Sequence, residues 1–480
     1  MKTIKHIYKS IVLVPLMVLS VSCGDDFLEL QPPLQVANEE FLLTVDDFQA
    51  AILGTYDQMQ LADYYGRYFL LIPDIMGEDI KQNASANRGK EWAEYNGAPT
   101  TNQNEHREFW AEIYEVINMA NQMINTELEP PASRQEEYNN ILGQAHAVRA
   151  LGHFDLVRLF AQTYTFTSDA SHPGVPIVTE FDSEARPGRN TVAEVYGQII
   201  SDFEQAISLM NGTPENANAI SREAAQALLS RVYLYMGRYA EAEALATEVI
   251  NSGRFSLVPR DAYANQFLDG NSPEAIFEIA FNLVDNPGSD HIGGMYKESG
   301  YGDYLPSRQL FALFEDGDIR GTLFVDDDNL DGGIYADANG EGKRLYKYPS
   351  EGSIIATDNV PVIRLSEVHL IRAEARAKTG NDAGALADLN PIRERAGVAP
   401  LAGLSGQALV DAVLEERRRE LFGEGHRVFD ITRNQQDVVR TDCTSPTCTI
   451  TFPNDRFILP LPQEETDVNS NIQQAPGYGI

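Results

Sequence analysis

The sequence of 480 residues lacks the motifs that mark the common classes of enzyme. It contains no Gly-x-Ser-x-Gly elbow, no His-Glu-x-x-His helix and no phosphate-binding glycine loop. Its eight histidines are scattered. Its 71 acidic residues are so numerous that two carboxylates at a glycosidase-like separation have no diagnostic value. The sequence therefore predicts a protein that is not an enzyme and needs no cofactor.

Basic residues are scarce, with 37 lysines and arginines and a formal net charge of −34. No basic stripe is visible along the chain, and binding to nucleic-acid phosphates requires one. The composition therefore excludes a nucleic-acid partner. A highly soluble, exposed surface accounts for most of the negative charge.

No apolar run is long enough to cross a membrane, and the run at the N-terminus belongs to a targeting segment. Residues 1–22 carry three lysines and then a short apolar core from Ile11 to Leu19. Ser20-Val21-Ser22-Cys23 resembles the lipobox of bacterial lipoproteins, which are cleaved before a Cys that becomes lipidated. On this interpretation Cys23 carries acyl chains such as palmitate, and residues 23–40 form a lipidated tether. The alternative is an ordinary secretory signal followed by an incidental Cys.

An acidic pair, Asp25 and Asp26, follows this Cys after a single glycine. Such a pair resembles the signal that sends lipoproteins to the outer face of the outer membrane. We therefore expect a protein that is lipid-anchored in the cell outer membrane and faces the outside.

Cysteine is also scarce, with three residues in the whole chain. Because Cys23 is assigned to the lipid, Cys443 and Cys448 remain. Outside the reducing cytosol, two cysteines this close in sequence are expected to close a short loop as a disulfide. A zinc site would need further ligands nearby, and none is present.

Apolar residues at helical spacing fill the stretch from Pro361 to Arg433. In its first helix they recur every three or four residues, beginning with Leu365 and Val368, until Gly380 breaks the helix. A second helix follows, and a third, roughly Gln407 to Phe422, crowds three consecutive arginines beside glutamates. A helix, a glycine turn and an antiparallel helix form an αα-hairpin, which cannot bury its apolar face alone. We expect further hairpins to stack on it.

A second stretch carries the same hairpin signal. Gly237 and Ala242 stand five residues apart, as do Gly380 and Ala385, and this spacing matches the turn and second helix of a tetratricopeptide repeat. The two copies are too far apart for a tandem array, so long insertions must separate the hairpins. In the later copy we expect Pro391 to kink or stop the second helix.

These patterns predict a mostly α fold, built from tetratricopeptide-like helical hairpins with a large, irregular, loop-rich insertion domain. The N-terminal scaffold is expected over residues 41–253, with a binding loop at 60–105. The insertion covers residues 254–360, where Ala275 to Phe281 is a candidate strand. Residues 361–480 form the C-terminal helical region and its tail.

Several short motifs run through the C-terminal helical stretch. They are Arg364-Leu365-Ser366-Glu367, Arg372-Ala373-Glu374-Ala375, Asp388-Leu389-Asn390, Glu416-Arg417-Arg418-Arg419-Glu420-Leu421, Glu424-Gly425-His426-Arg427 and Phe429-Asp430. Together they resemble the signature of the SusD/RagB-like family of outer-membrane nutrient-binding lipoproteins. The resemblance implies capture of an oligosaccharide and its delivery to a SusC-like TonB-dependent transporter, over which the protein acts as a lid. Two alternatives stay open, namely capture of peptides and a surface-anchored glycoside hydrolase.

Loop aromatics flanked by polar residues are the candidate ligand contacts. Sugar rings have apolar faces and hydroxyl edges, so they dock on exposed Trp or Tyr beside Asn, Arg or Asp. One such set lies in the binding loop and comprises Arg88, Trp92, Tyr95 and Asn96. The other lies in the insertion and comprises Tyr296, Tyr301, Asp303 and Tyr304. The alternative is that each ring packs its own loop.

Asp327, Asn329 and Asp331 match the first half of a calcium-binding loop. The acidic residue expected at the twelfth position of such a loop is replaced by Ala338. The pattern leaves two interpretations, a weak calcium site and an acidic surface turn, and it favours the turn.

Overall fold

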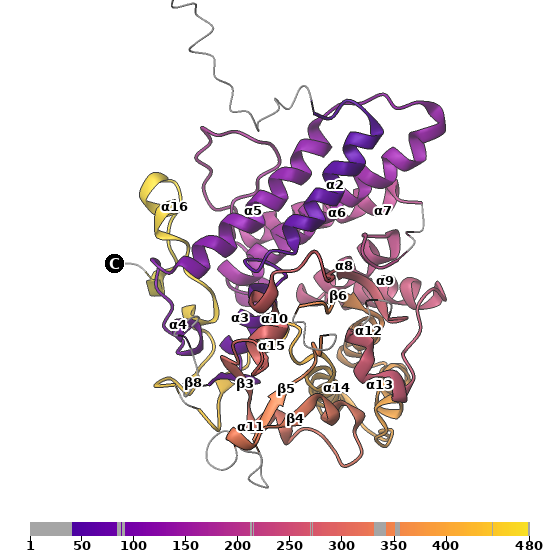
Figure 1. Ribbon diagram of the computed structural model, residues 1–480, viewed down its shortest axis with the longest axis vertical. Helices are drawn as coiled ribbons and strands as arrows, with labels where there is room; N and C mark the ends of the chain where they lie inside the picture. Colours follow the sequence, from indigo (N-terminus) through magenta and orange to yellow (C-terminus); the bar gives the residue numbers. More distant parts are fainter. Residues whose placement is uncertain are drawn as a thin grey trace, which may run out of the picture. The chain divides into compact units, whose positions relative to one another are not determined.

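Helices dominate the computed structural model of the chain, as the sequence predicts (Figure 1). The model describes residues 41–478 apart from 84–87, 89–91, 212–213, 215, 269, 271, 331–341, 351–355 and 444. The predicted signal peptide, Cys23 and the tether lie outside these residues. The elements described below all belong to one unit, Thr44–Ile480. Among the described residues, no helix is both long and apolar enough to span a membrane.

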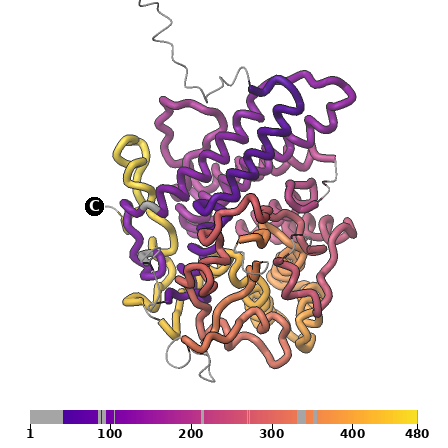
Figure 2. The backbone as a smooth tube through the Cα atoms, viewed as in Figure 1, coloured from indigo at the N-terminus to yellow at the C-terminus, as the bar shows by residue number. Residues whose placement is uncertain are grey.

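The main helices form the scaffold, and most of them pack on one another in a continuous series. They are α2 (Val45–Met59), α3 (Tyr68–Met76), α5 (Asn104–Asn125), α6 (Gln135–Phe160), α7 (Val192–Leu209), α8 (Arg222–Tyr235), α9 (Tyr239–Asn251), α12 (Leu365–Lys378), α13 (Asp382–Ala396), α14 (Gly406–Leu421) and α15 (Arg427–Arg433). The series runs from α5 through α6, α7, α8 and α9 to α12, and α12 also packs on α13 and α14. Figure 2 shows how the chain doubles back between successive helices.

The two predicted helical hairpins are present and lie against each other. Gly237 closes the α8–α9 hairpin with a φ of 75°, and Gly380 closes the α12–α13 hairpin with a φ of 82°. Both values lie in the left-handed region, which glycine adopts without steric cost. Because α9 packs on α12, the hairpins stack directly although their turns are far apart in the sequence.

Pro391 does not end the second helix of the later hairpin, so that part of the expectation is wrong. Helix α13 continues through Pro391 and ends at Ala396, where Gly397 adopts a φ of 88°. Proline removes one backbone hydrogen bond, but Arg393 in the following turn donates to Glu416 of α14 at 2.8 Å. Contacts with the neighbouring helix therefore hold the turn that proline weakens.

A pair of short strands closes the neck of the insertion. Strand β2 (Ala275–Ile279), predicted from the sequence, pairs antiparallel with β6 (Val360–Arg364), and Ile279 lies opposite Val360. Residues 280–359 therefore leave and re-enter the helical scaffold at one place. Within the insertion, α11 (Arg308–Phe311) is a single helical turn.

Three further strand pairs are shorter still. Strand β1 (Ile80–Gln82) pairs with β3 (Tyr304–Pro306), β4 (Phe324–Asp326) with β5 (Lys343–Leu345), and β7 (Val438–Val439) with β8 (Thr449–Ile450). The remaining short helices are α4 (Trp92–Tyr95), α10 (Ile292–Tyr296) and α16 (Gln463–Val468). The pairing of β1 with β3 joins the binding loop to the insertion.

Charged side chains fill the interior beside the end of α14. The buried ion-pair network consists of Glu274, Arg320, Lys347, Arg364, Arg395, Glu416, Glu420 and Glu424. None of these side chains is more than 5% exposed. Arg320 and Lys347 come from the insertion, so the network fastens the insertion to the C-terminal helices.

Candidate binding site

The β1–β3 pairing brings the two predicted sets of ligand contacts together. Gln82 lies opposite Tyr304, and the next residue, Asn83, donates its backbone N–H to the Asp303 carbonyl oxygen at 2.8 Å. The Asn83 side-chain amide donates to the Gly302 carbonyl oxygen at 3.1 Å. The loop that follows β1 and the loop that precedes β3 therefore start side by side.

Three of the predicted residues meet across these loops and form what we call the Arg88 cluster. Arg88 donates to an Asp303 carboxylate oxygen at 2.8 Å. The central carbon of the same guanidinium lies 3.2 Å from the centre of the Tyr301 ring. Asp303 is 1% exposed, whereas the Arg88 side chain is 33% exposed, so the arginine is presented to solvent from a buried anchor.

The Arg88 cluster has unused hydrogen-bonding capacity. The second carboxylate oxygen of Asp303 is buried and has no hydrogen-bond partner among the described residues. A guanidinium has five N–H donors, and the contacts to Asp303 engage one side of it. A partly exposed cation stacked on a ring is suited to a ligand that combines hydroxyl groups with a flat apolar face.

Four other predicted contacts are buried, and for them the expectation of exposure is wrong. Tyr95, Tyr296 and Tyr304 are at most 1% exposed, and Asn96 is 7% exposed. Arg440 covers the Tyr95 ring, with 4.7 Å between the guanidinium carbon and the ring centre. Buried rings cannot stack on a sugar, so these tyrosines belong to the packing of the protein.

Trp92 remains a prediction. Its backbone begins the short helix α4. Its side chain lies outside the described part of the structure, as do most residues of the loop between β1 and α4.

The predicted disulfide is present and supports the base of this region. Cys443 and Cys448 are joined, with their Cα atoms 5.6 Å apart. The neighbouring Asp442 forms an ion pair with Lys81 of β1 and accepts a hydrogen bond from the backbone N–H of Arg308 at 2.9 Å. The cross-linked loop thereby contacts both the β1 strand and the segment after β3.

The calcium hypothesis stays a prediction. Asp327 forms an ion pair with Arg344, and its other oxygen accepts from the Asn329 backbone N–H at 3.0 Å. Asp331 lies outside the described residues. Within the described ranges, no group of three or more His, Cys, Asp or Glu side chains is placed to hold a metal ion.

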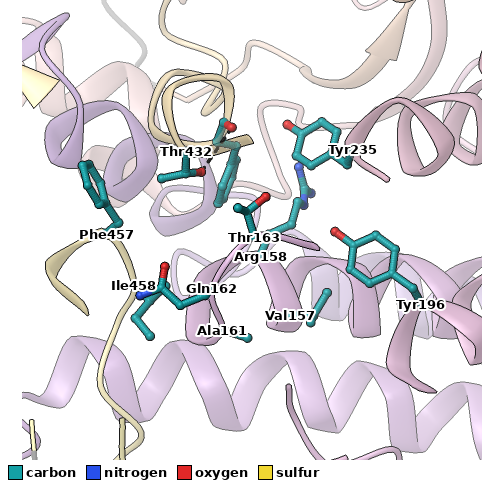
Figure 3. A pocket seen from close by; sticks show the side chains of 11 residues that line it. Val157, Arg158, Ala161, Gln162, Thr163, Tyr196, Tyr235, Thr432, Phe457 and Ile458 are labelled. Atoms are coloured by element: carbon teal, nitrogen blue, oxygen red, sulfur yellow. Dashed lines mark hydrogen bonds between the residues drawn. The ribbon is translucent and has the colours of Figure 1, made fainter. Parts of the chain in front are cut away.

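A small cavity among aromatic rings lies between α6 and the C-terminal segment (Figure 3). It holds about 20 Å³ and is lined by Arg158, Tyr196 and Tyr235 among others. This volume fits about one water molecule and excludes a sugar ring. Arg158 is also held by Asp155, so the cavity belongs to the packing of the core.

Two family models match the sequence in separate parts. Residues 26–234 match a model described as "Starch-binding associating with outer membrane", and residues 327–478 match one described as "SusD family". SusD-like protein P2 of Formosa agariphila is 29% identical, over 98% of this chain and 99% of that protein. The matched stretches include the binding loop, α12–α15 and the tail.

Solved structures with the same architecture cover nearly the whole chain. A protein from Bacteroides vulgatus, provisionally described as sugar binding, is 32% identical and superposes with a TM-score of 0.82, over 92% of this chain and 100% of that chain. A SusD superfamily protein from Bacteroides thetaiotaomicron is 30% identical with a TM-score of 0.82, over 90% of this chain and 100% of that chain. These likenesses confirm the mostly helical architecture.

Proposed function

The chain belongs to the SusD superfamily, and we propose that it captures oligosaccharides at the outer face of the outer membrane without altering them chemically. The Arg88 cluster carries this proposal. It joins an exposed guanidinium, a tyrosine ring and a buried carboxylate from two loops that a strand pair holds in place. Such a set supplies hydrogen-bond donors for hydroxyl groups beside an aromatic ring, on a rigid helical scaffold.

The sequence supports attachment to the membrane through lipid on Cys23. The matching family model is itself described as associating with the outer membrane. A Cys23→Ala variant should move from the outer-membrane fraction to the soluble fraction, because the acyl chains are its only proposed anchor. Retention of the variant in the membrane fraction would contradict a lipid anchor at this residue.

Delivery to a SusC-like TonB-dependent transporter is the second half of the proposal. A protein that binds its ligand without cleaving it must release the ligand to another carrier. The lid role follows from the family resemblance of the C-terminal motifs. Co-purification of the tagged protein with a TonB-dependent transporter from detergent-solubilised outer membranes tests it, and recovery of the protein without any such transporter would contradict it.

A glycan panel distinguishes the proposal from its two alternatives. The purified protein is incubated with maltoheptaose, laminarihexaose, xylohexaose, cellohexaose and a tryptic peptide mixture, and binding is measured by calorimetry. Binding of a glycan without release of new reducing ends supports capture. Release of reducing ends would show a glycoside hydrolase, and binding of peptides alone would show a peptide-capturing protein.

Arg88→Ala and Trp92→Ala, each measured with the best glycan of the panel, locate the site. The first removes the exposed donors of the cluster, and the second removes the predicted stacking ring. Unchanged affinity in both variants would exclude the binding loop as the place of capture.

A further inference from the structure

A second pocket, of about 420 Å³, lies between α5, residues 176–187 and the segment around α16. Figure 1 shows α16 beside α5, at the edge of the helical series. No residue of the Arg88 cluster lines this pocket, which we call the Trp110 pocket after its tryptophan. Its volume is in the range of ordinary small-ligand sites.

One face of α5 forms the floor of the pocket and is polar. Tyr114 donates its hydroxyl to the Pro176 carbonyl oxygen at 2.9 Å, and Asn121 donates to the Val178 carbonyl oxygen at 3.1 Å. Asn125, one turn further along, donates to the Thr179 carbonyl oxygen at 2.8 Å. These side chains hold an extended segment along the helix.

Asn118 belongs to the same face but does not join this pattern. It stands one helical turn from Tyr114 and nearly one from Asn121, and it lines the pocket. Its amide oxygen is buried and has no hydrogen-bond partner among the described residues. An unsatisfied buried acceptor costs about 1–3 kcal/mol, so a donor supplied by a ligand would be favoured there.

Aromatic and apolar side chains form the walls. The rings of Trp110 and Tyr114 pack at a tilt, with their centres 4.9 Å apart. Phe181 is 63% exposed and Val468 is 68% exposed, and both line the pocket. Large apolar side chains left this open to water at the rim of a pocket provide a surface for the apolar face of a ring.

The charges around the pocket select among ligands. Glu115, Glu180, Asp182 and Glu465 line it, whereas Arg186 is the only basic residue among the lining residues that the structure describes. Burial raises the pKa of Glu465, and a hydrogen bond from Trp110 opposes this. The pocket therefore offers acceptors and negative charge, which favour hydroxyl donors and repel carboxylated or sulfated sugars.

We propose that the Trp110 pocket is a second saccharide site, which takes a ring of a neutral glycan and rejects acidic sugars. The ring would lie against Phe181 and donate a hydroxyl hydrogen bond to Asn118. The proposal rests on the proposed function for its class of ligand, but it concerns a different surface. Two separated contacts on one long glycan would raise the apparent affinity for the chain over that for a single unit.

The chain has two tryptophans, Trp92 in the binding loop and Trp110 at the second pocket, and this allows separate readouts. In a Trp92→Phe variant, Trp110 is the only tryptophan, and its emission reports on the second pocket. Titration with the four neutral glycans of the panel should shift this emission for at least one of them. Trigalacturonic acid at the same concentrations should not.

Phe181→Ala, made in the Trp92→Phe background, should weaken the Trp110 response at least fivefold. Phe181 is largely exposed, so its removal leaves the core unchanged. Phe166→Ala is the matched control, because Phe166 is 39% exposed and lies outside this pocket, and it should leave the response unaltered. Asn118→Leu should reduce the response further by removing the acceptor at similar volume.

The outcomes separate this proposal from the proposed function. Calorimetric binding that depends on Arg88, with no Trp110 response to any of the four glycans, overturns the second site and leaves capture intact. A Trp110 response that persists in Phe181→Ala, or that trigalacturonic acid also produces, overturns the proposal as well. Absence of any binding by either readout overturns both.

Discussion

Two groups of this molecule each pair arginine with carboxylates, but their surroundings are opposite. In the buried ion-pair network, Arg364 donates to Glu420 at 2.7 Å and to Glu424 at 2.8 Å, and no member is more than 5% exposed. In the Arg88 cluster, the arginine is 33% exposed and has one carboxylate partner. The two groups differ in whether water reaches the N–H donors of the arginine. A buried guanidinium whose donors are all paired with carboxylates stabilises the fold, whereas a guanidinium with free donors at the surface can bind a ligand.

Removal of a central carboxylate from the buried ion-pair network should have the largest effect on stability and tests this comparison most directly. Glu420→Ala leaves Arg320, Arg364 and Arg395 with one partner fewer inside the protein. Loss of one partner from a buried pair is expected to cost about 3–5 kcal/mol of the free energy of unfolding. Urea unfolding followed by circular dichroism measures it.

Glu415→Ala is the matched control for that variant. Glu415 lies on the same helix, is 51% exposed and pairs with Arg419. Exposed pairs contribute about 0–1 kcal/mol, so this variant should unfold close to the parent. Equal destabilisation by both variants would show that burial does not distinguish the two environments.

Acidification should weaken the scaffold, because it protonates buried carboxylates that are paired with arginines. Burial alone would raise the pKa of Asp430, but Arg417 and Arg433 outweigh it and hold the pKa at about 2. The ordinary aspartate value is about 3.9, so the unfolded chain binds protons more readily. The stability from this residue is complete above about pH 4 and is lost as pH falls towards 2.

The loss from Asp430 amounts to roughly 2.5 kcal/mol. Arginines likewise lower the pKa values of Glu367, Glu374 and Glu420 against the effect of burial. Protonation of these three carboxylates should therefore add to the loss. Urea midpoints measured between pH 5 and pH 2 test the expectation. A midpoint that stays constant across that range would contradict the assignment of the stability to paired carboxylates.

The disulfide provides an intermediate test, because it supports the strand beneath the surface cluster. Replacing both Cys443 and Cys448 with serine opens a loop of six residues. The chain-entropy estimate for so short a loop is about 2 kcal/mol of unfolding free energy. Thermal unfolding of the double variant, compared with the parent under oxidising and reducing conditions, measures it. Identical behaviour of the parent under both conditions would argue against a stabilising cross-link.

The smallest effect on stability is expected at the surface cluster itself. Arg88→Ala should destabilise the fold less than Glu420→Ala, because it breaks one partly exposed pair and not three buried ones. It should nevertheless lower affinity for the best glycan about tenfold, which corresponds to about 1.4 kcal/mol of binding free energy. Arg134→Ala is the control, since Arg134 is 31% exposed and paired with Asp46 and Glu137. A comparable loss of affinity in both variants would contradict a specific role of Arg88 in glycan binding.

The helical part of the fold was predictable because its signals are local. Spaced apolar residues and a glycine five residues before an alanine predicted both hairpins, and Gly237 and Gly380 close them as expected. The stacking of α9 on α12 follows from the need of each hairpin to bury its apolar face. The continuation of α13 through Pro391 was not predictable, since it depends on Glu416 of another helix.

No local sequence pattern indicates that these charged side chains are buried. The run of arginines and glutamates on α14 is indistinguishable in sequence from a solvated helix face, yet Glu416, Arg417 and Glu420 are fully buried. Their partners come from the insertion and from α12 and α13. A pattern read along one helix does not contain those partners, so the buried network could be found only in three dimensions.

The candidate sites were predicted in part. Arg88, Tyr301 and Asp303 were named from loop composition, but the pairing of β1 with β3 that unites them has no signature in either strand. Tyr95 was predicted to be exposed, but it is covered by Arg440, which lies 345 residues further along the chain. Asn118 was not identified from the sequence, because its unsatisfied oxygen is visible only from the geometry.

The strand pair at the neck of the insertion has a consequence for how such a protein diversifies. Because Ile279 and Val360 face each other, the two ends of the segment 280–359 lie side by side in one strand pair. A graft at these two ends would exchange the part of the proposed binding surface that carries Tyr301 and Asp303. Any grafted segment would have to supply cations in place of Arg320 and Lys347, or leave Glu416, Glu420 and Glu424 with one partner fewer each.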